Sequence, residues 1–105
     1  MARKSQTDLD ETAVAESRDK AERPPLYRVL LHNDDFTTME FVVYVLMTIF
    51  RLGDAEAIRV MLEVHTEGVG VAGVYPFEIA ESKARKVVEM ARAEQFPLMC
   101  SIQEE

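Results

Sequence analysis

Three consecutive side chains, Asn33, Asp34 and Asp35, stand between two apolar stretches and are the first candidates for chemistry. Their oxygen atoms accept hydrogen bonds, and two adjacent carboxylates attract a positively charged group. Asn and Asp are also common in turns, because their short side chains bond to the neighbouring backbone. The residue types therefore fit two interpretations, a binding site for a cationic group or ordinary turn chemistry.

A histidine is the second candidate, because its spacing predicts a place on an apolar helix face. Ile58, Met61, Leu62 and His65 recur at i, i+3, i+4 and i+7, which is the spacing of one helix stripe. We expect this stripe to be buried, with His65 at its last turn. There it either serves as a satisfied structural residue or reaches the same concavity as Asn33. Two histidines and a single cysteine make a poor zinc set, so we expect no metal and no other cofactor.

The elements on either side of the Asn-Asp-Asp triplet place it at the mouth of a helix. Residues 27–31 are apolar and typical of a short strand, and residues 38–50 form a longer apolar run typical of a helix. Thr37 followed by Glu40 fits a capping box at the start of that helix. The positive end of the helix dipole would partly offset the two carboxylates.

Glycines mark the next boundaries. Gly53 is expected to close the first helix, and Asp54 is expected to cap a second helix that stops at Gly68. The run over residues 68–75 predicts a glycine-interrupted strand. It is not a phosphate loop, because it lacks the Gly-Lys-Ser/Thr ending of that motif.

A third helix is predicted over residues 76–95 and a last strand over residues 98–102. The expected buried stripe of this helix consists of Ile79, Ala80, Ala84, Val87, Val88 and Ala91. Its expected outer face carries Glu78, Glu81, Ser82, Lys83, Arg85, Lys86 and Glu89. The order β-α-α-β-α-β predicts an α+β sandwich, in which one small three-stranded sheet is packed by three helices.

Charge and composition separate a polar leading segment from one folded domain. Residues 1–25 hold five basic and six acidic groups and few large apolar ones, so we expect a flexible tail that cannot offset its ordering entropy. Residues 26–105 then form a single core domain with seven basic and thirteen acidic groups, a net charge of −6. An acidic domain disfavours nucleic acid and favours a cationic ligand.

The chain contains no run long enough for a membrane span, so we expect no membrane partner. Residues 1–25 lack the apolar core of a signal peptide, so we do not expect export. Cys100 is the only cysteine, which excludes an internal disulfide and suits the reducing cytoplasm. Its apolar neighbours predict a buried strand thiol rather than a nucleophile.

Short segments spread over residues 24–103 carry a family resemblance. They are 27–31, 33–37, 39–42, Met61, Leu62, Val64, His65, Gly73, Val74, Glu78, Ala80, Glu81, Lys83, Pro97, Leu98 and Cys100. In a single register they resemble the ClpS family, the adaptors that carry N-degron substrates to the bacterial Clp protease. Thr38 stands where the family usually has proline, and Ala72 where a cysteine is common. Thr38 lies beside the expected pocket, where it would alter which side chains are accepted.

The resemblance implies a role for each matched residue in binding the free N-terminus of a protein. Asn33, Asp34 and a neutral His65 would accept hydrogen bonds from its ammonium group, and Asp35 would hold the peptide backbone. Met39 at the rim would clash with first residues that branch at Cβ. The first side chain, Leu, Phe, Tyr or Trp, would enter a hydrophobic pocket walled by Thr37, Met39, Val42, Met61, Val64 and Leu98.

The resemblance also implies a protease partner. The exposed face of the third helix, with Glu78 and Lys83, is similar to the surface that docks on the N-terminal domain of the ClpA unfoldase. Residues 1–25 resemble the extension that engages the unfoldase during delivery. A monomeric, cytoplasmic adaptor that is not an enzyme is therefore expected.

Two other classes of protein compete with this interpretation. A small acid–base hydrolase would use Asp34, Asp35 and His65, although no serine, cysteine or lysine nucleophile belongs to the same constellation. A structural interaction domain like the C-terminal domain of the ribosomal stalk protein would share the sandwich, but it predicts no ligand pocket.

Overall fold

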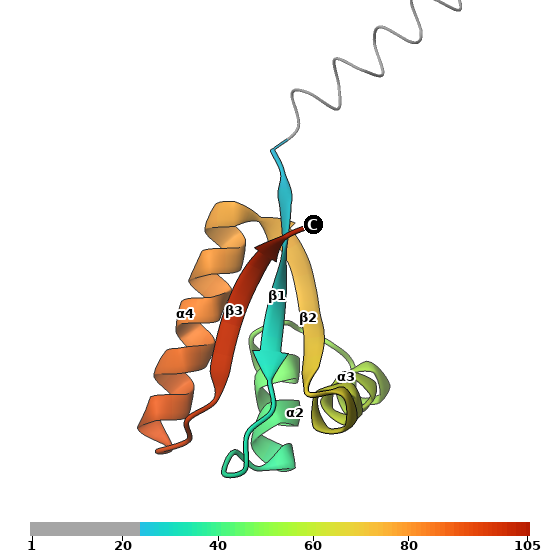
Figure 1. The fold of residues 1–105 in the computed structure, drawn as a ribbon, viewed down its shortest axis with the longest axis vertical. Helices are drawn as coiled ribbons and strands as arrows, with labels where there is room; N and C mark the ends of the chain where they lie inside the picture. The colour runs from blue at the N-terminus through green and yellow to red at the C-terminus, as the bar shows by residue number, and fades with distance from the viewer. Residues whose placement is uncertain (1–23) are drawn as a thin grey trace, which may run out of the picture.

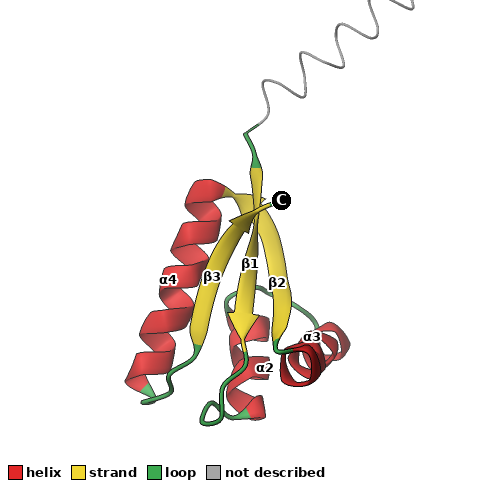
Figure 2. Ribbon diagram, in the orientation of Figure 1, coloured by secondary structure: helices red, strands yellow, loops and turns green. Residues whose placement is uncertain are grey.

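The structure, a computed structural model, describes residues 24–105. The expected tail, residues 1–25, therefore lies outside the described residues except for its two final prolines. The elements are β1 (Leu26–His32), α2 (Met39–Thr48), α3 (Asp54–Glu67), β2 (Val69–Pro76), α4 (Phe77–Ala93) and β3 (Met99–Glu104) (Figures 1 and 2). The predicted β-α-α-β-α-β order, with one three-stranded sheet and three helices, is confirmed.

β1 is the central strand of the sheet, with β2 on one side and β3 on the other, and both pairings are antiparallel. Val29 pairs with Gly73 of β2 and with Ile102 of β3. Between Val29 and Leu30 the register with β2 shifts, so that Ala72 forms a bulge. Because strands on both sides hold β1, the loop that follows β1 leaves the sheet from a fixed base.

The hydrophobic core lies between one face of the sheet and the helices. Val29 and Leu31 of β1 are fully buried, as expected for alternate residues of a strand with one inward face. Figure 1 shows α4 running alongside β3, whereas α2 and α3 gather at the end of the sheet where β1 ends. The remaining core residues are Val42, Val45, Leu46, Ile49, Phe50, Ala57, Val60, Val64, Ala72, Ala80, Val87, Ala91 and Leu98.

The start of α2 differs from the prediction. Thr38, and not Thr37, caps the helix, because its hydroxyl oxygen accepts a hydrogen bond from the Phe41 N–H at 3.1 Å. The Thr37 hydroxyl is occupied elsewhere, since it donates to the carboxylate of Asp34. The capping-box prediction was therefore wrong: the N-cap lies one residue later, and Phe41 stands where a capping box needs Glu or Gln.

The boundary between α2 and α3 also differs. α2 ends with Ile49 as its C-cap, several residues before Gly53. Gly53 is the N-cap of α3 without a side-chain hydrogen bond, and Asp54 is the first helical residue rather than the cap. Gly68 ends α3 as predicted, in the left-handed region at φ 89°, which glycine adopts without strain.

The buried face of α3 is rotated from the expected stripe. Its buried residues are Ala57, Val60 and Val64. Ile58 and Leu62 are instead 46% and 47% exposed, and His65 is exposed as well. The prediction followed the largest apolar side chains, but the small Ala57 lies on the flank that packs closely against the rest of the domain. His65 is thus not a core histidine.

α4 follows its predicted stripe with two exceptions. Ala80, Val87 and Ala91 are buried, whereas Ile79 is 48% exposed. Lys83, expected on the outer face, is half-buried and points its ammonium group into the domain. Ile79 is exposed beside the fully buried Ala80, whereas Lys83 is held inward by the hydrogen bond from its ammonium group to the Ile49 carbonyl.

Candidate functional site

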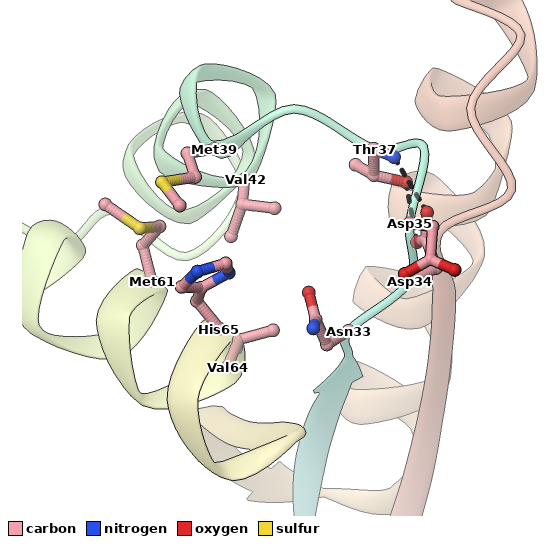
Figure 3. Close-up of a pocket in the computed structure, with 9 residues that line it drawn as sticks. All are labelled: Asn33, Asp34, Asp35, Thr37, Met39, Val42, Met61, Val64 and His65. Carbon is pink, nitrogen blue, oxygen red and sulfur yellow. Dashed lines mark hydrogen bonds between the residues drawn. The ribbon is translucent and has the colours of Figure 1, made fainter.

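A cavity of about 240 Å³ lies where the loop between β1 and α2 meets the flanks of α2 and α3. The loop contributes four polar side chains, α2 contributes two apolar ones, and α3 contributes two apolar ones and a histidine (Figure 3). The nine lining residues are Asn33, Asp34, Asp35, Thr37, Met39, Val42, Met61, Val64 and His65. The structure therefore brings Asn33 and His65, which are distant in sequence, to the same cavity.

Asn33 is held beside α3 by its backbone. The Asn33 N–H donates to the Gly68 carbonyl at 2.9 Å, and the Gly68 N–H donates to the Val64 carbonyl at 3.0 Å. These bonds tie the end of β1 to the last turn of α3, which is the turn that carries His65. The Asn33 side chain and the His65 ring consequently reach the cavity from neighbouring elements (Figure 3).

Asp34 organises the loop. One carboxylate oxygen accepts from the Phe36 and Thr37 N–H groups at 2.8 and 2.7 Å, and the other accepts from the Thr37 hydroxyl at 2.7 Å. Burial acts to raise the pKa of Asp34, but the hydrogen bonds from Thr37 and Phe36 outweigh it, so that this pKa lies below its ordinary value. Asp34 is therefore a negative charge whose two oxygens are already engaged within the loop (Figure 3).

The sequence interpretation left turn chemistry open for the whole triplet but did not identify Asp34 as the residue that forms the loop. Its signal was present, because an Asp followed two and three residues later by backbone donors, with Thr at the third, is typical of an Asx turn. The turn interpretation is thus confirmed for Asp34, whereas the binding role of the triplet stays a prediction. Turn chemistry shapes the loop that lines the cavity.

The polar side of the cavity is acidic. Asp35 is exposed, lines the cavity beside Asp34, and makes no side-chain hydrogen bond among the bonds within residues 24–105. The nine lining residues include no lysine or arginine. A positively charged group would therefore be attracted to the loop side of the cavity.

The helical side of the cavity is apolar. Val42 and Val64 are buried and form its inner wall, whereas Met39 is 42% exposed and stands at its rim. Gly70 of β2 allows α3 to lie close to the sheet: a Cβ there would meet the Val64 Cγ2 at 2.7 Å. The position of this wall thus depends on a residue outside the cavity.

Leu98 is the one predicted pocket residue that the structure does not place among the lining side chains. It is 1% exposed and belongs to the hydrophobic core. It precedes β3, which lies on the far side of β1 from β2, the strand that contacts α3. Leu98 is therefore enclosed in the core, and its place in the pocket wall stays a prediction.

The two residues predicted for the partner surface have different environments. Glu78 is exposed in the first turn of α4. The Lys83 Nζ instead donates to the Ile49 carbonyl at 2.8 Å, and it lies 5.9 Å and 5.3 Å from the ring centroids of Phe50 and Tyr75. Glu78 is available to a partner, whereas the charge of Lys83 is engaged within the domain.

No cluster of three or more His, Cys, Asp or Glu side chains within residues 24–105 is arranged to hold a metal ion. No helix in this range combines the length and the apolar character that crossing a membrane requires.

The fold and the cavity together define a small α+β domain with a hollow that is acidic and hydrogen-bonding on one side and apolar on the other. A structural interaction domain without a pocket, one of the alternatives, does not fit this geometry. Residues 22–101 match the family described as "ATP-dependent Clp protease adaptor protein ClpS". The chain belongs to the ClpS family of Clp protease adaptors, as the resemblance predicted.

Individual relatives agree with this assignment. The chain is 55% identical over 92 residues to the ATP-dependent Clp protease adapter protein ClpS of Desulfatibacillum aliphaticivorans, covering 88% of each chain. It is 49% identical over 105 residues to that of Roseobacter denitrificans, covering 100% of this chain and 93% of the relative. It also resembles the solved structure of Agrobacterium tumefaciens ClpS2 bound to L-phenylalaninamide, with a TM-score of 0.76 and 41% identity over 79% of this chain and 100% of that one.

Proposed function

We propose that this adaptor binds the free N-terminus of proteins whose first residue is Leu, Phe, Tyr or Trp, and that it delivers them to the ClpA unfoldase. The observation that carries the proposal is the meeting of hydrogen-bond acceptors and an apolar wall in one cavity. A free N-terminus carries an ammonium group and its first side chain on the same carbon atom. Both groups are satisfied together only in a site whose hydrogen-bond acceptors and apolar wall lie within the reach of a single residue.

The proposed contacts follow the two sides of the cavity. The ammonium group donates to the Asn33 side-chain oxygen and to a ring nitrogen of a neutral His65, and the charge of Asp34 attracts it. Asp35 accepts from the peptide backbone. The first side chain lies against Thr37, Met39, Val42, Met61 and Val64. Leu98 packs in the core.

The size of the cavity and the ligand of a relative support this assignment. The cavity, about 240 Å³, is smaller than the roughly 300–1,000 Å³ of sites for drug-sized ligands, so it suits one amino-acid residue. The related Agrobacterium protein was solved with L-phenylalaninamide. This compound is an ammonium group, a benzyl side chain and a carboxamide on one carbon, the same features that a protein beginning with Phe presents.

Peptide titrations test the binding function. Fluorescence anisotropy should show binding of peptides that begin with free Phe or Leu, and a loss of tenfold or more for N-acetylated and Val-initial peptides. Acetylation removes the donor charge, and Val branches at Cβ against Met39. Asn33→Ala and His65→Ala should each weaken binding about tenfold. Thr66→Ala, at an exposed neighbouring position, is the control. Equal affinity for free and acetylated peptides would refute the proposal.

Delivery to ClpA is tested separately. We propose that Glu78 belongs to the docking surface, that residues 1–25 engage the unfoldase, and that the adaptor acts as a cytoplasmic monomer. Glu78→Lys should slow ClpAP degradation of a Phe-initial reporter without changing peptide affinity, whereas Glu89→Lys, also exposed on α4, should not. Deletion of residues 1–25 should likewise keep peptide binding and impair degradation. Unchanged degradation by both variants would exclude this mode of delivery.

A further inference from the structure

Exposed apolar side chains lie on α2 and α3, the two helices that form the apolar side of the cavity. Met39 and Met47 of α2, and Ile58 and Leu62 of α3, are each more than a third exposed. Met61, which lines the cavity, lies beside them on α3. We call these five residues the α2–α3 strip.

Helix geometry places the strip on one side of the domain. On α2, Phe41 and Tyr44 lie toward the end of α4, and the Phe41 ring lies 5.0 Å from the ring of Phe96, which follows that helix. Met39 and Met47, eight residues apart, fall within one broad face of α2, about 80° apart around its axis. Figure 3 shows the side chain of Met39 next to that of Met61 at one edge of the cavity.

The α3 part of the strip is adjacent to His65. Met61 and Leu62 precede His65 by four and three residues, and Ile58 precedes Leu62 by four, so these side chains are neighbours on the helix surface. Val60 and Glu63, on the other flank, approach Gly70 of β2. The strip thus extends away from the amine-binding side of the cavity and away from the sheet.

We propose that the α2–α3 strip binds the side chains of residues 2 to 4 of the substrate, and that it favours apolar residues there. This inference rests on the proposed function, because an anchored first residue brings the next residues to the rim. Met39 to Met47 spans about 12 Å along the helix, the length that three or four residues of an extended peptide cover. Unbranched methionine side chains adapt to different apolar partners, which suits substrates whose sequences vary.

Peptides that differ only after the first residue test the inference. The probes are two fluorescent peptides with free N-terminal Phe, one with Leu and one with Ser at positions 2 to 4, and L-phenylalaninamide as a competitor. We expect the Leu peptide to bind about tenfold more tightly than the Ser peptide. Failure of L-phenylalaninamide to compete would refute the proposed function, whereas competition with equal peptide affinities would refute the strip alone.

Two variants test whether the α2–α3 strip causes the preference for the Leu peptide. Leu62→Ser should remove most of the preference for the Leu peptide while leaving competition by L-phenylalaninamide unchanged, because Leu62 does not line the cavity. Ile79→Ser, at an apolar position of α4 with matched exposure, should keep the preference. A preference that survives in Leu62→Ser, or that disappears equally in Ile79→Ser, would overturn the assignment. Self-association that Leu62→Ser abolishes would also overturn it, because a second copy would then occupy the strip.

Discussion

Replacing Lys83 with Met tests whether an internal cation fixes the end of α2. The Lys83 Nζ donates to the Ile49 carbonyl at 2.8 Å and lies near the rings of Phe50 and Tyr75. α2 has no basic residue in its last turn, so α4 supplies the cation that the negative end of this helix dipole favours. Met keeps most of the apolar stem of lysine and removes the charge and the three donors.

The contacts set the size of the expected loss. A hydrogen bond to a charged group contributes about 1.5–3 kcal/mol, and each partly exposed cation–π contact about 0.5–1 kcal/mol. Because Lys83 is only half-buried, solvent replaces part of what is lost. We therefore expect Lys83→Met to lower the free energy of unfolding by about 2–3 kcal/mol, a large share of the roughly 5–15 kcal/mol of a small domain.

Urea unfolding followed by circular dichroism measures this loss. With a slope of about 1.5 kcal/mol per M for a small domain, the midpoint should fall by roughly 1.5 M. Lys86→Met is the matched control, because Lys86 is exposed on the same helix and should change the midpoint little. If the two variants lose the same stability, the capping role of Lys83 is wrong and the residue is free to serve a partner.

Three further predictions concern the loop bonds of Asp34, the close packing at Gly70 and the thiol of Cys100. Because the pKa of Asp34 is lowered in the folded state, the carboxylate stabilises the fold above its ordinary pKa of 3.8, and this stabilisation is lost as pH falls through the folded pKa. Asp34→Ala should therefore lower the free energy of unfolding by about 1 kcal/mol at neutral pH and reduce its dependence on pH in acid, measured by urea unfolding. Gly70→Ala should destabilise by about 1–3 kcal/mol in urea unfolding, because its Cβ meets Val64, whereas Gly53→Ala, with open space around it, should not. Cys100 is half-buried, and desolvation of its thiol raises its pKa to about 12. Iodoacetamide should therefore react slowly at about pH 8 and much faster in urea, and equal rates would contradict this protection.

The order of elements could be predicted because each segment has a simple pattern. β1 alternates between buried and half-buried residues, and Gly68 marks the end of α3. The faces of the helices could not be predicted as well, because alanine has little hydropathy and yet occupies the closest contacts. Ala57 and Ala80 are fully buried, while Ile58 and Ile79 next to them are nearly half exposed.

The cavity was predictable to the extent that its residues share short segments or a helix flank. Residues 33–37 came from one loop, and His65 from a helix whose direction the fold fixes. The positions of Leu98 and Lys83 could not be predicted from such local patterns. Lys83 depends on the end of α2, whose carbonyl it binds, and Leu98 is enclosed in a core that several elements form.

Much of the site depends on residues that would not touch a ligand. Asn33 is positioned by a bond from its backbone to Gly68, and the wall at Val64 is positioned by the close approach at Gly70. Both carboxylate oxygens of Asp34 accept hydrogen bonds within the loop, so in the proposed complex Asp34 would attract the ammonium group by its charge rather than by a free acceptor. In the proposed mode of binding, backbone and loop bonds fix the distance between the acceptors and the apolar wall. That distance, more than any single contact, would then select a ligand that carries its charge and its apolar group on one carbon.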